Sequence, residues 1–209
     1  MAKKEKKLLI VIRDFESDTN ELQNTFKELD YCIVESLPNT YMRVEWKTPA
    51  AYIDSLKSYF RAKLLKHLKR AEALNIRHEL VEDFAGSADI LCKQWLVVHN
   101  NADEFQREIL TPDFYREFSK KLGKASKTIF FYQNDVQVAH VLLFMDGDLL
   151  RWLYFGRTVS ENDSLYIYAA HKVIEAAILL GAKEMELGLT TYSIKKDLGA
   201  QVTSLKLAI

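Results

Sequence analysis

The sequence predicts an α/β (α+β) protein with a mixed, mostly antiparallel central sheet flanked by helices, and with an N-terminal strand–helix extension. Tight-turn residues at 134–135 and 146–148 separate apolar runs, which is typical of an antiparallel meander. Thr-Pro pairs at 48–49 and 111–112 open amphipathic segments and indicate helix N-termini. Seven glycines and three prolines in 209 residues favour regular elements joined by short loops.

The N-terminal extension begins with a continuous apolar run at residues 8–13, which predicts a buried strand. Asp18 or Thr19 can cap the helix that follows. Two short strands are then expected at 31–35 and 40–46, and the second alternates in a way that predicts one buried face.

The longest predicted helix runs over residues 48–74, with an apolar stripe on one side. Its other faces carry a run of cations, namely Lys57, Arg61, Lys63, Lys66, Lys69 and Arg70. Such a run indicates either a surface for an anionic substrate or an ordinary solvated helix face. A strand at 76–82 and helices at 88–100 and 112–122 are expected next.

The C-terminal half is predicted to alternate strands and helices. Strands are expected at 127–133, 136–145, 149–155, 183–187 and 202–207, and helices at 164–180 and 191–198. Gly181 suits the end of the longer helix, because helix C-caps favour a left-handed residue. Within 151–199 this order brings a loop and a helix N-terminus beside the ends of two strands, where α/β proteins commonly bind ligands.

Composition and charge narrow the function classes. Lys+Arg and Asp+Glu balance at 29 each, so no global field favours nucleic acid or a membrane surface. Cys32 and Cys92 have neither disulfide-framework nor zinc spacing, which favours a reducing, cytoplasmic location. The apolar run near the N-terminus is too short for a signal-peptide core or a membrane span. The five histidines form no HxH or HExxH pattern, so no metal site is expected, and His140 is expected to be a core histidine.

Two segments carry a resemblance to a known family. Residues 50–76 read AAYIDSLKSYFRAKLLKHLKRAEALNI, a tyrosine-bearing helix start before a basic, arginine-containing helix. Residues 184–200 read EMELGLTTYSIKKDLGA, a strand and then a short helix with a lysine four residues before a glycine. With the order of elements after residue 88, these segments resemble the Fem-like (FemAB-type) branch of the GNAT acyltransferase superfamily. That branch transfers amino acids or acyl groups to amines.

The resemblance covers about residues 30–207 and implies a GNAT-like acyltransferase domain at 85–209, behind an N-terminal portion at 1–84. In the superfamily, a glycine-rich loop receives the pyrophosphate of acyl-CoA, because small residues let backbone N–H groups approach phosphate. The corresponding stretch here, FGRTVSENDSLY, has Gly156 alone, and Glu161 and Asp163 would repel a pyrophosphate. Many Fem-like proteins also lack this loop. The resemblance implies acyl-CoA as co-substrate, but this departure from the phosphate loop counts against coenzyme A binding and leaves a tRNA-linked or other acyl donor open.

Acyl transfer to an amine needs a base, a group that polarises the carbonyl, and an acid for the leaving group. The resemblance implies a backbone N–H around Tyr154, Phe155 and Gly156 as the polarising group, and Lys195 beside the leaving group. Tyr192, one turn before that lysine, is either an acid or substrate contact, or a partly buried core tyrosine.

The remaining charged candidates also allow two interpretations. Lys195 belongs to a lysine pair that a solvated surface helix would explain equally well. Glu186 can act as the base, directly or through water, or can simply face solvent from its strand. Arg157 can bind a phosphate or carboxylate in bidentate fashion, or can form an ion pair with Glu161 or Asp163.

Arg61 matches the arginine of the Fem-like pattern and, with Tyr41 and Arg43, forms the expected substrate-binding set. The leading hypothesis is an N-acyltransferase in which an amine-bearing acceptor attacks the activated donor directly. The alternatives are a GNAT-like module that has lost catalysis, and RNA binding through the basic helix. An open splay between two C-terminal strands favours the transferase, and a splay filled by Trp152 or Tyr166 favours the module. The sequence does not specify the oligomeric state.

Overall fold

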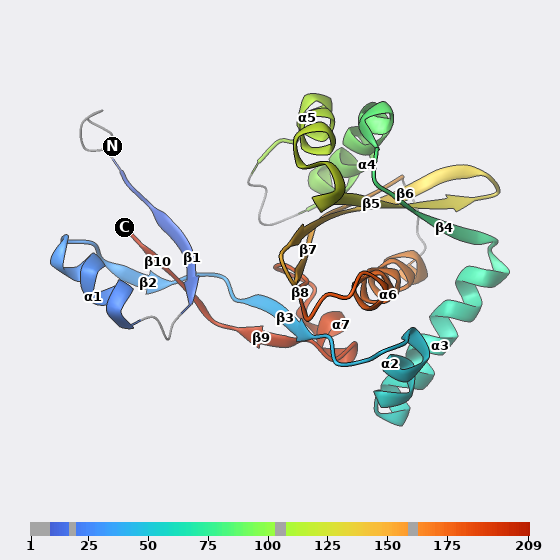
Figure 1. Ribbon diagram of the computed structural model, residues 1–209, viewed down its shortest axis with the longest axis horizontal. Coiled ribbons are helices and arrows are strands. Elements are labelled where there is room, and N and C mark those ends of the chain that lie inside the picture. The colour runs from blue at the N-terminus through green and yellow to red at the C-terminus, as the bar shows by residue number, and fades with distance from the viewer. Residues whose placement is uncertain (1–8, 17–19, 103–107, 159–162) are drawn as a thin grey trace.

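The computed structural model describes residues 9–16, 20–102, 108–158 and 163–209. A seven-stranded sheet forms the body, and a three-stranded sheet with one helix projects from it as an arm (Figure 1). The strands of the large sheet are β3 (Asn39–Arg43), β4 (Ile76–Val81), β5 (Ser126–Gln133), β6 (Val136–Asp146), β7 (Leu149–Arg157), β8 (Glu184–Glu186) and β9 (Gln201–Thr203).

The large sheet has the strand order β4-β5-β6-β7-β8-β3-β9. Its neighbouring strands are antiparallel except β7 and β8, which are parallel, so the predicted mixed and mostly antiparallel sheet is confirmed. The predicted turn between β5 and β6 is also confirmed, since Asn134 and Asp135 have φ values of 49° and 64°, as a type I′ turn requires. Strands from both sides of the boundary proposed after residue 84 belong to this sheet.

The arm brings together the two ends of the described chain (Figure 1). It consists of β1 (Ile12–Glu16), α1 (Asn20–Glu28), β2 (Ile33–Glu35) and β10 (Leu205–Ala208), with β10 in the middle of the sheet. Phe26 of α1 packs on Phe15 and Tyr31, with ring centroids 5.2 and 5.7 Å away. The first strand begins four residues later than predicted, and the prediction that it is buried is wrong, since four of its five residues are exposed. The final predicted strand is divided between β9 and β10, which belong to different sheets.

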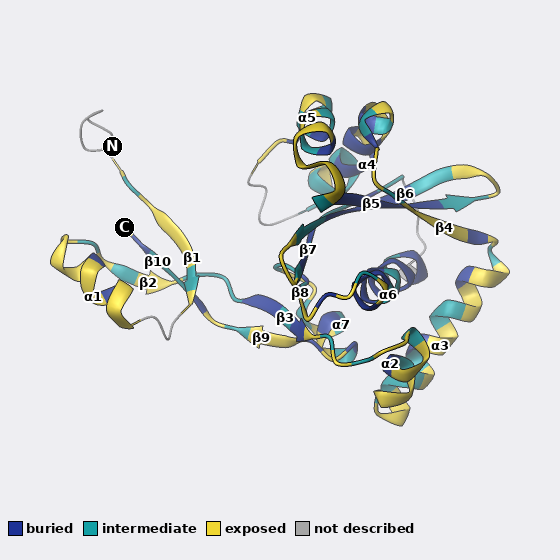
Figure 2. Ribbon diagram, in the orientation of Figure 1, coloured by how far each residue is buried: buried dark blue, intermediate teal, exposed yellow. Residues whose placement is uncertain are grey.

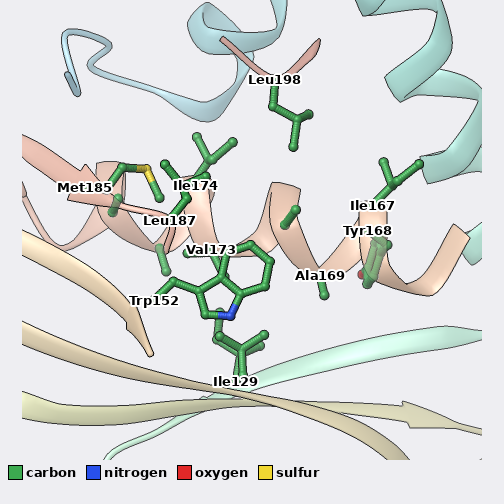
Figure 3. Packing of buried hydrophobic residues seen from close by; sticks show 14 of the residues in the cluster. Ile129, Trp152, Ile167, Tyr168, Ala169, Val173, Ile174, Met185, Leu187 and Leu198 are labelled. Carbon is green, nitrogen blue, oxygen red and sulfur yellow. The ribbon is translucent and has the colours of Figure 1, made fainter. Parts of the chain in front are cut away.

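Helices cover both faces of the large sheet (Figure 1). One face carries α4 (Ala88–Asn100) and α5 (Pro112–Leu122), with 3-10 turns at Ala85–Ser87 and Gly123–Ala125. The other face carries α6 (Asp163–Leu179), α2 (Pro49–Ser55) and α3 (Ser58–Ala73). Helix α6 is mostly buried (Figure 2), because it lies between the sheet and α3. Ile129 and Trp152 point from the sheet toward Ala169 and Val173 of α6 (Figure 3). Within the described part of the chain, no helix combines the length and the apolarity needed to cross a bilayer.

The single helix predicted at 48–74 is two helices. Thr48 caps α2 as expected, its hydroxyl accepting a hydrogen bond of 3.2 Å from the N–H of Ala51. Leu56 then adopts an extended conformation with ψ 141°, which ends α2. Arg61 of α3 donates to the carbonyl of Asp54 at 3.0 Å and so satisfies one of the carbonyls that this break leaves open.

Candidate active site

A cleft of about 740 Å³ opens where β7 and β8 separate. The two strands run parallel and pair over three positions, the last being Arg151 with Glu186. Beyond that pair β7 continues along β6 to Arg157, whereas the chain after β8 passes through Gly188 at φ 75°. The cleft therefore lies at the carboxyl ends of parallel strands, with further walls from α3, α4, α6 and α7 (Tyr192–Asp197). The two strands are therefore splayed apart, and both Trp152 and Tyr166 line the gap between them.

The β7 wall presents backbone N–H groups to the cleft. The register of β7 on β6 shifts at Leu153, which forms a bulge, and is regular beyond it. The N–H of Thr158 donates to the carbonyl of Val138 at 2.8 Å. Because hydrogen-bonding groups alternate along an antiparallel pair, the N–H groups of Phe155 and Arg157 face away from β6, toward the open edge. Both residues line the cleft.

Gly156 lies between these two residues and serves packing. It pairs with His140, and a Cβ at this position would lie 2.3 Å from His140 Cε1 and 2.7 Å from the backbone nitrogen of Trp95. His140 is fully buried, and its ring nitrogens bond to Tyr115 at 3.2 Å and to Gln94 at 2.9 Å. Burial lowers the pKa of His140 to about 3, so the ring is neutral. His140 is the core histidine that was predicted, and the absence of a side chain at Gly156 makes room for it.

Lys195 of α7 lies on the opposite wall. Its ammonium group donates to the carbonyls of Gly188 at 2.9 Å and Leu189 at 2.7 Å, which occupy two of its three donors. The residue is only 2% exposed, and burial lowers the pKa of its amine to about 8. Lys196 is exposed on the same helix, so the solvated-surface interpretation holds for Lys196 and not for Lys195.

The segment between β8 and α7 is strained and is held by α6. Thr190 and Thr191 have φ values of 63° and 46°, in the left-handed region that β-branched residues rarely adopt. The hydroxyl of Tyr166 is 2.8 Å from the hydroxyl of Thr191. The Tyr166 ring packs against Trp152 and Phe155, with centroids 5.6 and 5.3 Å away. Tyr166 thus connects the two walls of the splay.

Helix α3 contributes Lys63 and His67 to the cleft. Lys63 forms an ion pair of 2.5 Å with Asp197, and His67 Nδ1 is 3.0 Å from the hydroxyl of Ser164. Sequence reasoning placed both residues on the basic helix but not in the site. Their spacing of four residues puts them on one helix face, but nothing local shows that this face borders the cleft.

Two further residues that were predicted to belong to the site, Tyr154 and Arg157, lie on β7. Tyr154 lines the cleft, but its hydroxyl donates to Glu108 at 2.8 Å, and burial together with that carboxylate raises its pKa. Arg157 also lines the cleft. Its predicted ion-pair partners cannot be placed, since Glu161 and the side chain of Asp163 lie outside the described residues.

Three predicted residues lie elsewhere on the sheet. Glu186 forms an ion pair with Arg151 and accepts a hydrogen bond of 2.5 Å from Asn39. Tyr41 and Arg43 line a separate hollow of about 790 Å³. The structure therefore does not bring these side chains to the cleft, because strand alternation directs them toward other partners.

Tyr192 and Arg61 also do not line the cleft. The hydroxyl of Tyr192 donates to the carbonyl of Pro38 at 2.9 Å, and Arg61 is held by the α2 carbonyl described above. Among the described residues, no group of three or more His, Cys, Asp or Glu side chains is placed to hold a metal ion.

No family model matches the chain. Two curated proteins from Mycobacterium tuberculosis, strains CDC 1551 / Oshkosh and ATCC 25618 / H37Rv, are 26% identical to it over 166 residues. Both are named putative 8-amino-7-oxononanoate synthase 2, and the match covers 76% of this chain. The matched region spans 21%, about a fifth, of the length of these relatives.

Solved structures share the fold over nearly the whole chain. The C-terminal DUF2156 domain of a putative lysylphosphatidylglycerol synthetase from Agrobacterium fabrum has a TM-score of 0.70 at 12% identity, covering 95% of this chain and 66% of that one. FemX has a TM-score of 0.69 at 14% identity, with coverage of 99% and 73%. A GCN5-related N-acetyltransferase from Sphaerobacter thermophilus has a TM-score of 0.54 at 10% identity, with coverage of 95% and 59%. The chain therefore has a GNAT-like fold in the arrangement shared with FemX and the synthetase domain, as the Fem-like resemblance predicted.

Proposed function

We propose that this chain transfers an acyl or aminoacyl group from an activated donor to an amine. The observation that carries the proposal is the open splay, in which the N–H of Phe155 faces a cleft whose opposite wall holds the buried Lys195. Solved structures of this fold include proteins named as an N-acetyltransferase and as a putative synthetase, which supports a transfer reaction.

In the proposed reaction the donor carbonyl accepts a hydrogen bond from the N–H of Phe155. The amine nitrogen attacks the carbonyl carbon, the new C–N bond forms, and the C–S or C–O bond to the leaving group breaks. A fixed donor at the developing oxyanion contributes about 3–4 kcal/mol in comparable sites. Holding both reactants in one cleft supplies a further part of the rate.

The donor that we propose first is acyl-CoA, and an aminoacyl-tRNA is the alternative. Arg157 and Lys195 line one cleft and would supply positive charge for the phosphates of either donor. Trp152 is buried beneath α6 (Figure 3), and Tyr166 bridges the two walls at one point, but a cleft of about 740 Å³ remains beside them. The open cleft favours the transferase over a module without catalysis.

Calorimetric titration with acetyl-CoA, a long-chain acyl-CoA and free coenzyme A tests this proposal. Lys195→Ala should weaken binding about 10- to 100-fold, because one charge-assisted contact contributes about 1.5–3 kcal/mol. Lys196→Ala is the matched control, since it removes a neighbouring but exposed lysine. The affinity of this variant for the coenzyme A compounds should stay within about twofold of that of wild type.

If coenzyme A compounds do not bind, transfer from aminoacyl-tRNA to hydroxylamine is measured next, with the same two variants. Transfer that depends on Lys195 and not on Lys196 would support the aminoacyl version. Absence of binding and of transfer with every donor would refute the proposed function.

A further inference from the structure

Tyr166 occupies a position that neither the sequence motifs nor the proposed reaction has used. It extends from α6 into the splay, where its hydroxyl is 2.8 Å from that of Thr191 on one wall. Its ring is edge-on to Phe155, which carries the outward N–H, on the other wall. The phenol therefore lies between the proposed oxyanion donor and the segment that leads into α7.

We propose that Tyr166 is a further catalytic residue of this site and delivers a proton to the leaving group. The inference rests on the proposed function. As the tetrahedral intermediate collapses, the bond from carbon to the leaving sulfur or oxygen breaks, and the leaving atom takes the phenolic proton. The phenolate then takes the proton that the attacking nitrogen loses. In sum, one proton passes from the amine to the leaving group, and no other reactant is consumed.

The other groups near the cleft that could carry a proton already have hydrogen-bond or ion-pair partners. Tyr192 and Glu186 do not line the cleft, and each has a partner outside it. The hydroxyl of Tyr154 donates to Glu108. Lys195 uses two of its three donors on backbone carbonyls.

The surroundings of Tyr166 suit an acid. Burial raises the pKa of its phenol, so the group keeps its proton at neutral pH. Arg157 and Lys195 line the same cleft, and their positive charge favours the phenolate formed during transfer. Thr191 holds the hydroxyl in place, and its left-handed backbone is the kind of strain that functional sites retain.

The test compares two activated donors whose leaving groups differ. Wild type and Tyr166→Phe are assayed with acetyl-CoA, or with aminoacyl-tRNA if the titration identifies that donor, and with p-nitrophenyl acetate, using hydroxylamine as the common acceptor. We expect kcat of Tyr166→Phe to fall at least 100-fold with the first donor, the usual size of a general-acid effect, while KM changes less than about threefold. With p-nitrophenyl acetate the loss should be below about threefold, because nitrophenolate leaves without a proton.

Thr191→Val separates chemistry from positioning, because it removes the partner hydroxyl and leaves the phenol. If Tyr166 only supports the strained segment, both variants will lose activity equally with both donors, which overturns the inference. As a second measurement, 3,5-difluorotyrosine at position 166 keeps the ring and hydroxyl but lowers the pKa of the phenol. The alkaline limb of the kcat–pH profile should then move to lower pH, and a limb that stays in place overturns the inference even if Tyr166→Phe does not fold.

The two proposals can fail separately. A wild-type protein that transfers acyl groups while Tyr166→Phe matches it in kcat refutes the role of Tyr166 alone. A wild-type protein that transfers nothing from any donor refutes the proposed function, and the role of Tyr166 with it.

Discussion

Replacing Gly156 by alanine should destabilise the protein and disturb the cleft together. The added Cβ would lie 2.3 Å from His140 Cε1 and 2.7 Å from the backbone nitrogen of Trp95. Carbon atoms in contact are normally about 3.5–4.0 Å apart, so the new Cβ and His140 Cε1 would have to move apart by more than an ångström. His140 is fully buried and hydrogen-bonded through both ring nitrogens, and Trp95 contributes helix backbone, so neither neighbour can move freely. Overpacking of this kind costs about 1–3 kcal/mol.

Thermal unfolding followed by circular dichroism checks this prediction. For a protein of this size each kcal/mol lowers Tm by about 2–4 °C, so Gly156→Ala should lose between about 2 and 12 °C. Gly86→Ala is the control, because a Cβ there meets nothing within 4 Å, and it should stay within about 0.5 kcal/mol of wild type. Equal Tm values for both variants would refute the reasoning, because α4 and β7 could then move apart without lowering the free energy of unfolding. Displacement of β7 also moves Phe155, so transfer activity should fall in Gly156→Ala and not in Gly86→Ala.

Three other predictions concern titration and thiol access. Burial lowers the pKa of Lys195 from 10.5 to about 8, so the free energy of unfolding decreases as pH falls from about 10.5 to 8. Urea unfolding at pH 7.5 and 9.5 should show wild type gaining about 2 kcal/mol at the higher pH relative to Lys195→Met. Burial lowers the pKa of His171 to about 4, and neither ring nitrogen has a hydrogen-bond partner among the described residues. The pKa of this ring in the unfolded chain is near 6.5, so the free energy of unfolding decreases as pH falls below that value. Between pH 7.5 and 5, the free energy of unfolding of His171→Leu should decrease by about 2 kcal/mol less than that of wild type. An equal decrease in both proteins would contradict the reasoning. Cys32 is exposed and Cys92 buried, so Ellman's reagent should titrate one thiol in the native protein and two in urea.

Local chemistry made much of the fold predictable. Thr48 and Thr111 accept hydrogen bonds from backbone N–H groups in the first turns of their helices, at 3.2 Å each. Asn134 and Asp135 form the turn that their side chains favour. Such features depend on residues close in sequence, which is why they can be predicted without knowledge of distant contacts.

The candidate site was less predictable, because its composition depends on partners distant in sequence. Lys195 was correctly placed on the short helix, but its burial results from the backbone fold of residues 188–191. Glu186 forms an ion pair with Arg151 and does not line the cleft, because the pairing of β7 with β8 places these two residues side by side. His67 enters the cleft because α3 packs beside α6, a contact that no local pattern encodes.

The outward N–H of Phe155 has a consequence for how this protein can be engineered and how it can evolve. The group belongs to the main chain and is exposed because β7 outlasts its pairing with β8, so every amino acid except proline supplies it. Side-chain scanning will therefore miss it, and replacement of that one amide by an ester is the substitution that removes it. In the proposed reaction, the walls of the cleft can accept new side chains for new donors and acceptors while this hydrogen-bond donor is kept with the sheet. The proposed function then allows the substrate range to change by side-chain substitution alone.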